Sequence, residues 1–412
     1  MKGGWPRPSA VVDRRRSVQV RLADRTVDLA RLRAQPGAHR ALLERARTVE
    51  GHGWCLCAEP APRLVIRNRS GTYYLACWPG GGAEHGSGCD FHRDGGAWSG
   101  RSSYRSGALT EELDGTARAS LSVPLSVRAG EPEIRPDRTT PPHGSGGGRM
   151  SLLGLLHYLW ERAELTTSPP GRRNWADCHP ALLQAAGQIM IGDRPLTGSC
   201  YVVPPFDPAV PDRHRASFER FINGLGTFAG RTRRGLIVGA VRALAETPYG
   251  HRIDLRHHRS PLFVSGALYD RLRRAAPSVF AESRPPGSEQ ILLALIQRSE
   301  AGNLSIVAAA TMLTNRRLVP ADSGHEVVMA DALAAAGRAF YKPLRYDGDA
   351  DLLPDFVLTD TDPLTAVEVW GMLGRADYAA RQRTKVAQYR LKQTPLIEWD
   401  PSGPLPDLAI RP

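Results

Sequence analysis

Four of the chain's six cysteines fall between residues 55 and 89, and this clustering constrains the fold more than any other feature of the sequence. The surrounding segment is rich in glycine and holds two histidines. Zinc takes four soft or borderline ligands in tetrahedral geometry, usually from two short turns separated by a hairpin. A small Gly-rich module buries too little apolar surface to fold alone, so a structural zinc ion would be a folding requirement. We therefore predict a zinc-ribbon-like module.

The predicted zinc ligands come from a C-x-C turn and an H-x3-C turn: they are Cys55, Cys57, His85 and Cys89. Between the turns, RLVIRNRSGTYYLAC predicts a β-hairpin that reverses over residues 68–71. Cys77 and His92 lie close enough in sequence to replace one ligand. Buried free cysteines and a thiol-redox pair remain alternatives, because C-x-C is less diagnostic of zinc than C-x-x-C.

The length of 412 residues exceeds one ordinary domain and predicts a multi-domain α/β (α+β) protein. A stretch rich in Pro, Gly, Ser and Thr marks the clearest boundary. We expect an N-terminal helical and zinc-binding module (1–128), a flexible linker (129–150), a helical, winged-helix-like segment (151–234), a β-rich domain (235–320) and a C-terminal domain (321–412).

Apolar spacing predicts the elements within these segments. Residues 27–50 predict two short helices broken at Pro36 and Gly37, and residues 116–127 predict a strand pair. The helix-helix-strand order after the linker favours a winged helix, with a helical layer packed on the following sheet as the alternative. Residues 235–320 predict strands, a helix and then a hairpin that turns at EAGN.

Charge favours a polyanionic partner. Lys and Arg exceed Asp and Glu by 54 to 42, a net charge of +12. Only four of the 54 are Lys, so GC-rich codon usage explains part of the excess, and the short, scattered basic runs fit a solvated surface. No apolar run reaches the ~18 residues of a membrane span, and no signal peptide is present. We expect a cytoplasmic protein that contacts nucleic acid, DNA before RNA.

Two carboxylates fall on neighbouring predicted strands near the C-terminus. PDFVL begins its strand at Asp355, and AVEVWG carries Glu368 in the next one. Antiparallel strands can bring such carboxylates together as the hard oxygen site that Mg²⁺ or Mn²⁺ prefers. A metal held there can activate water and stabilise the leaving oxygen of a phosphodiester. The alternative is a turn role for Asp355 and a solvated position for Glu368.

This pattern resembles the PD-(D/E)XK nuclease superfamily, whose core is a mixed sheet flanked by helices. Pro354 and Asp355 match the first half of its motif, and Glu368 matches the second carboxylate. Trp370 stands where the family has Lys, the residue that positions or activates the attacking water. The resemblance implies a restriction-endonuclease-like domain in residues 321–412.

Two lysines could supply the positive charge of the family's Lys, which Trp370 replaces here. Lys385 shares one face of the predicted helix 375–390 with Tyr378, Arg381, Gln388 and Tyr389. Lys342 precedes the PD strand. In the superfamily the preceding helix often supplies another acid, and here this is Glu326, which also forms a predicted capping box with Ser323.

The whole chain resembles a family of bacterial proteins of unknown function found on plasmids and integrative elements. The residues that carry the likeness are GWCLC, the H-x3-C turn, GLLHYLWERAEL, KPLRYD, LPDFVL and EVWGM, followed by Y, R and K. Membership implies a mobile-element setting, with proteins of that element as partners. We expect a metal-dependent DNA endonuclease or nickase; the alternatives are a non-catalytic DNA-binding or scaffolding protein with a degenerate nuclease fold, and an RNA-directed activity.

Overall fold

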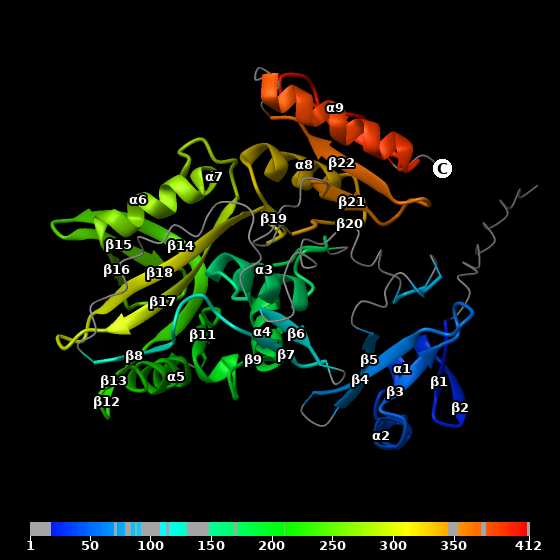
Figure 1. Ribbon diagram of the computed structural model, residues 1–412, viewed down its shortest axis with the longest axis horizontal. Coiled ribbons are helices and arrows are strands. Elements are labelled where there is room, and N and C mark those ends of the chain that lie inside the picture. The colour runs from blue at the N-terminus through cyan, green and yellow to red at the C-terminus, as the bar shows by residue number, and fades with distance from the viewer. Residues whose placement is uncertain are drawn as a thin grey trace, which may run out of the picture. The chain divides into compact units, whose positions relative to one another are not determined.

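The chain separates into two compact units, which are described here one at a time (Figure 1). Our computed structural model describes residues 18–69, 72–78, 84–86, 89–91, 108–112, 115–129, 148–168, 171–209, 211–344, 353–371 and 376–409. The first unit comprises Met1–Gly95 with Leu113–Gly115, and the second comprises Gly96–Glu112 with Thr116–Pro412. No helix among these described residues is long and apolar enough to cross a membrane.

The first unit is a five-stranded antiparallel sheet with two helices. Its elements are β1 (Gln19–Leu22), β2 (Arg25–Asp28), α1 (Leu29–Ala34), α2 (Arg40–Val49), β3 (His52–Cys55), β4 (Arg63–Arg69) and β5 (Thr72–Cys77), and the strands run in the order β2-β1-β3-β4-β5. Both helices predicted over residues 27–50 are present, and so is the predicted hairpin, formed by β4 and β5. Alternate residues of the strands, such as Leu22 and Leu64, pack with Leu32 and Leu43 of the helices in one core.

The second unit begins with short strands that pair with later parts of the chain. These are β6 (Leu109–Glu111), β7 (Ala117–Ala119) and β8 (Ser126–Arg128). The predicted pairing within residues 116–127 is wrong: β7 pairs with β6 and with β9 (Ile189–Ile191), whereas β8 pairs with β13 (Arg231–Arg233). Because these pairings lie in the second unit, that unit begins before residue 128. The predicted linker lies almost wholly outside the described residues.

A ring of five strands forms the centre of the second unit. Its strands are β14 (Gly235–Thr247), β15 (Gly250–Leu255), β16 (Leu262–Val264), β17 (Glu289–Arg298) and β18 (Leu304–Thr314). The long strand β14 pairs with β17 through its first half and with β15 through its second half, which follows a bulge between Val241 and Ala243. The remaining pairs are β15 with β16, β16 with β18, and β18 with β17. The ring is therefore closed.

Helices pack against this ring (Figure 1). They are α3 (Leu152–Arg162), α4 (Trp175–Gly187), α5 (Pro211–Asn223), α6 (Gly266–Ala275) and α7 (Pro277–Phe280). α3 and α4 share one core with β14, β17 and β18, in which Leu155, Trp160 and Leu182 pack near Leu236 and Leu293. This is the helical layer on the following sheet that the sequence allowed as the alternative to a winged helix. Parallel to β14 runs β11 (Cys200–Val202), while β10 (Arg194–Pro195) extends β9 and β12 (Gly226–Phe228) extends β13.

The C-terminal part of the second unit has three layers. After β19 (Pro320–Ala321) come α8 (Gly324–Ala335), β20 (Phe340–Tyr341), β21 (Phe356–Leu358), β22 (Thr365–Val369), α9 (Ala376–Leu391) and β23 (Leu396–Trp399). The sheet order is β20-β21-β22-β23; the first three strands are antiparallel, and β23 runs parallel to β22. Val367 and Val369 share a core with Met329 and Leu333 of α8, so Glu368 between them faces the opposite side of the sheet, towards α9.

Candidate metal centre and buried ionic cluster

Three thiols and one imidazole of the first unit converge at one point. The four predicted ligands offer atoms that all lie within 4.8 Å of one another, and they are Cys55, Cys57, His85 and Cys89. Cys55 Sγ lies 3.5 Å from Cys89 Sγ, and Cys57 Sγ lies 3.3 Å from His85 Nδ1. Three thiolates and an imidazole are a donor set that suits Zn²⁺. This Cys/His cluster could therefore hold a metal ion such as zinc.

Local backbone geometry brings the two ligand turns together. Cys55 is the last residue of β3, and the chain turns directly after it to carry Cys57 back. In the second turn, the backbone N–H of Cys89 donates to the carbonyl of Gly86 at 2.9 Å. A side chain at Gly86 would place its Cβ 2.9 Å from the Cys57 carbonyl oxygen, closer than real Cβ contacts allow. Glycine therefore permits the close approach of the two turns.

Hydrogen bonds and burial shift the pKa values of the thiols in the absence of a metal. A hydrogen bond from the Cys55 thiol lowers the pKa of Cys89 to about 5, and it raises the pKa of Cys55. The backbone N–H of Phe91 also donates to Cys89 Sγ, at 3.4 Å. Burial raises the pKa of Cys57. Metal binding would release the protons that the thiols still carry.

Of the two reserve ligands, Cys77 does not join this cluster. Cys77 donates through Sγ to the backbone carbonyl of Trp78 at 3.3 Å and belongs to no metal-binding group of the described residues. His92 lies outside the described residues. The two remaining cysteines, Cys178 and Cys200, are buried in the core of the second unit.

A second cluster, in the C-terminal part of the second unit, pairs lysines with carboxylates. Glu368 of β22 is 1% exposed, and Lys385 Nζ of α9 lies 2.8 Å from each of its carboxylate oxygens. Tyr389, one helical turn after Lys385, donates its hydroxyl to Glu368 Oε1. Lys385 also donates to the carbonyl of Leu353 at 2.7 Å. The solvated position that the sequence allowed for Glu368 is therefore wrong.

The second lysine of this cluster lies after β20. Lys342, 2% exposed, donates to Glu326 Oε2 of α8 at 2.7 Å and to Asp322 Oδ2 at 2.9 Å. Ser323 caps α8 by accepting from the Glu326 N–H, as predicted. However, the Glu326 carboxylate accepts from the Asp322 N–H instead of completing the capping box. Asp322 was missed by the sequence reasoning, and its place next to an N-cap residue was the available signal.

Asp355 connects the two lysine-carboxylate pairs. It precedes β21, is 6% exposed, and accepts a hydrogen bond from the Val369 N–H at 2.8 Å. Burial and, after it, the nearby Asp355 charge raise the pKa of Glu368 to about 7 against the opposing effect of Lys385. Burial likewise raises the pKa of Glu326, and Asp355 acts on it in the same direction. These carboxylates are therefore close enough to repel one another.

The structure thus brings all five predicted residues of the C-terminal site together, and Asp322 joins them. We call this set the Lys/carboxylate cluster: Asp322, Glu326, Lys342, Asp355, Glu368 and Lys385. Trp370 lies beside it, with the Lys385 ammonium 5.9 Å from its ring centroid and its indole N–H bonded to Glu398 at 2.9 Å. Within the described part of the chain, only the Cys/His cluster has three or more ligand atoms gathered within 4.8 Å.

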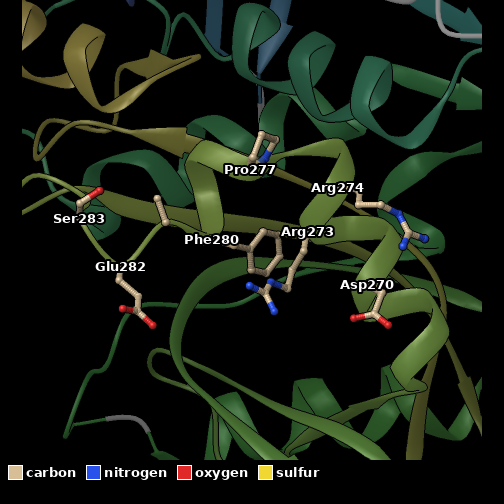
Figure 2. A pocket seen from close by; sticks show the side chains of 8 residues that line it. Asp270, Arg273, Arg274, Pro277, Phe280, Glu282 and Ser283 are labelled. Atoms are coloured by element: carbon tan, nitrogen blue, oxygen red, sulfur yellow. The ribbon is translucent and has the colours of Figure 1, made fainter.

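A shallow pocket of about 750 Å³ lies elsewhere in the second unit, at α6 and α7 (Figure 2). Its charged lining is mixed in sign, with Asp270 and Glu282 against Arg273 and Arg274. The Arg273 guanidinium lies 6.0 Å from the Tyr269 ring centroid. The pocket holds none of the residues singled out by the sequence, and its mixed charge favours no class of ligand.

Comparisons with known proteins place the chain in a family. No curated protein and no solved structure matches it. One family model matches residues 27–402, a range that includes both the Cys/His cluster and the Lys/carboxylate cluster. The chain therefore belongs to the family described as "Protein of unknown function (DUF1173)".

Proposed function

We propose that this protein is a metal-dependent DNA endonuclease or nickase of a bacterial mobile element, with its hydrolytic site in the Lys/carboxylate cluster. The observation that carries the proposal is the charge of that cluster. Three buried carboxyl groups, together with that of the more exposed Asp322, face two buried ammonium groups, so negative charge exceeds positive charge when all of them are ionised. Such an excess is costly in a protein interior unless a cation compensates it. A single divalent cation would do so.

Asp355 and Glu368 are the residues that would hold Mg²⁺ or Mn²⁺. Carboxylate oxygens are the ligands these ions prefer, and the mutual repulsion of the two groups would be relieved by the ion. When bound, the ion would polarise a phosphodiester and lower the pKa of a water. Lys385 is the cation next to Glu368 and would orient that water or the phosphate. It would do so from α9, in place of the lysine that Trp370 replaces.

The order of elements in residues 324–399 supports the same proposal. A helix, three antiparallel strands, a helix and a strand parallel to the third follow one another. The PD-(D/E)XK core is likewise a mixed sheet flanked by helices, with its two carboxylates on neighbouring strands. Here Asp355 directly precedes β21, and Glu368 lies on its neighbour β22.

The second candidate is a non-catalytic DNA-binding or scaffolding protein. One observation favours it: both oxygens of Glu368 already have partners, since Lys385 contacts both and Tyr389 donates to one. In this view the lysines have replaced the metal, and the fold is a degenerate nuclease. The two candidates differ in whether a metal ion can displace the Lys385 ammonium from the Glu368 carboxylate.

Cleavage of supercoiled and linear DNA with Mg²⁺ or Mn²⁺ distinguishes them. We expect the wild type to cut, and Asp355→Asn and Glu368→Gln each to lose at least about a hundredfold in rate, because each removes a metal ligand. The matched control is Glu246→Gln, an exposed carboxylate on β14. Circular dichroism and DNA binding should be unchanged in all variants. Binding without cutting by the wild type, on either DNA form, would establish the non-catalytic candidate.

A further inference from the structure

The five-stranded ring has a specific connectivity. β14, β15 and β16 follow one another as an antiparallel meander, α6 and α7 come next, and β17 and β18 close the ring as a hairpin. β16 pairs with β18 in parallel, and β17 returns to the first half of β14. This is the connectivity of the OB-fold, a five-stranded Greek-key barrel that binds ligands on the face of its second and third strands. In this chain these strands are β15 and β16.

The outward residues of that same face lie outside the two apolar cores around the ring. Inside the ring lie residues such as Ile237, Ile253 and Leu292, together with Leu268 and Leu272 of α6. The outer side of β14, β17 and β18 is covered by α3 and α4. The outward residues of β15 and β16 belong to neither core: Arg252 is exposed, and Phe263 is half-buried.

Arginine and aromatic residues lie on this face and in the turn beside it. Arg252 of β15 lies directly opposite Phe263 of β16. Tyr249, 94% exposed, lies in the turn between β14 and β15. Neither aromatic ring contacts another ring or a cation of the described residues. Arg242 and Arg252 share one carboxylate, that of Asp254, at 3.4 and 2.9 Å.

The two guanidinium groups can still contact a ligand, although both pair with Asp254. The side chains of Arg242 and Arg252 remain 58% and 45% exposed, and two positive charges face one negative charge. Arg259, in the loop that leads to β16, is exposed and forms no ion pair with a described residue. A ligand that fits must bring planar rings for Phe263 and Tyr249, and negative charge for the arginines.

We propose that the outer face of β15 and β16 binds single-stranded nucleic acid, with bases stacked on Phe263 and Tyr249 and phosphates near Arg242 and Arg252. Stacking accepts every base, and arginines contact the backbone, so this binding tolerates many sequences. The site goes beyond the proposed hydrolytic function and does not depend on Glu368. It would hold a separated strand, as a nicking or strand-processing enzyme requires.

Fluorescence anisotropy of a labelled oligothymidylate tests the proposal. An oligomer of about 20 nucleotides spans at least one OB-fold site, which covers about 4–16 nucleotides. The full chain is used with its zinc and without added Mg²⁺ or Mn²⁺, so that cleavage plays no part. We expect Tyr249→Ala with Phe263→Ala to weaken binding about fivefold or more, and Arg252→Gln to reduce the salt dependence by about one phosphate contact.

Two control variants test whether the loss of binding is specific to this face. Phe206→Ala removes another aromatic ring, 68% exposed, and Arg213→Gln removes an exposed arginine of α5; both should bind like the wild type. An oligouridylate of the same length shows whether DNA or RNA is preferred. Equal affinity of the wild type and the Tyr249/Phe263 variant would overturn the proposal, and so would a wild type that binds neither oligomer at about 50 mM salt.

Discussion

The two clusters of ionisable residues obtain positive charge in different ways. The Cys/His cluster gathers thiols and an imidazole, and no lysine or arginine takes part in its described contacts. The Lys/carboxylate cluster includes two nearly buried lysines that each contact a carboxylate. A bound metal ion would supply the positive charge of the first cluster, whereas in the second each lysine already pairs with a carboxylate. A metal ion in the second cluster would compensate the negative charge that the lysines leave.

Removal of zinc should produce the largest effect and test the first half of this comparison. We expect about one zinc per chain, lost in Cys55→Ser, because structural zinc contributes on the order of 10–16 kcal/mol in small modules. Atomic spectroscopy measures the metal, and limited proteolysis reports the unfolding of the first unit. Cys77→Ser is the control, since Cys77 is outside the cluster. Full zinc content in Cys55→Ser would break the comparison.

Removal of one partner from a buried ion pair of the Lys/carboxylate cluster should destabilise the second unit less than loss of zinc destabilises the first. Glu368→Ala leaves the Lys385 ammonium buried without its carboxylate, and breaking a buried pair costs ~3–5 kcal/mol. Combining it with Lys385→Met should recover most of the loss, because the unpaired charge is then gone. Calorimetry of the second unit's transition, without added divalent metal, measures both variants.

An exposed ion pair provides the control for this result. Asp212 and Arg215 of α5 pair with side chains 83% and 67% exposed, so Asp212→Ala should cost no more than about 1 kcal/mol. If Glu368→Ala cost as little as Asp212→Ala, the lysines would not hold the second cluster together. A metal ion would then be needed there as well.

Local chemistry made much of both clusters predictable. The members of the Cys/His cluster follow from residue type and turn spacing, and Lys385 follows from its helical step to Tyr389. Partners distant in sequence were not predictable in the same way. Alternation within residues 116–127 indicates strands, but it does not say that β7 pairs with β9 and β8 with β13.

The closed ring was likewise only partly predictable from the sequence. The hairpin of β17 and β18 was predicted from its Gly-Asn turn, and strands β14 to β16 from their apolar runs. Closure depends on the return of β17 to Gly235–Ala240, a pairing that no local pattern encodes. The OB-fold connectivity, and the face it leaves open, therefore emerged only from the structure.

A methyl group at Gly86 should give the smallest effect and sharpen the account of the Cys/His cluster. In Gly86→Ala the new Cβ would lie 2.9 Å from the Cys57 carbonyl, so the two ligand turns must move apart. We expect zinc affinity to fall about 10- to 100-fold, as when a metal site's supporting contacts are lost, while the fold persists in excess zinc. Competition with a chromogenic chelator measures the affinity. Gly37→Ala is the matched control, because nothing lies within 4 Å of its added Cβ. Equal affinities in the two variants would mean that the turns adapt freely, and that the cluster is less rigid than its hydrogen bonds suggest.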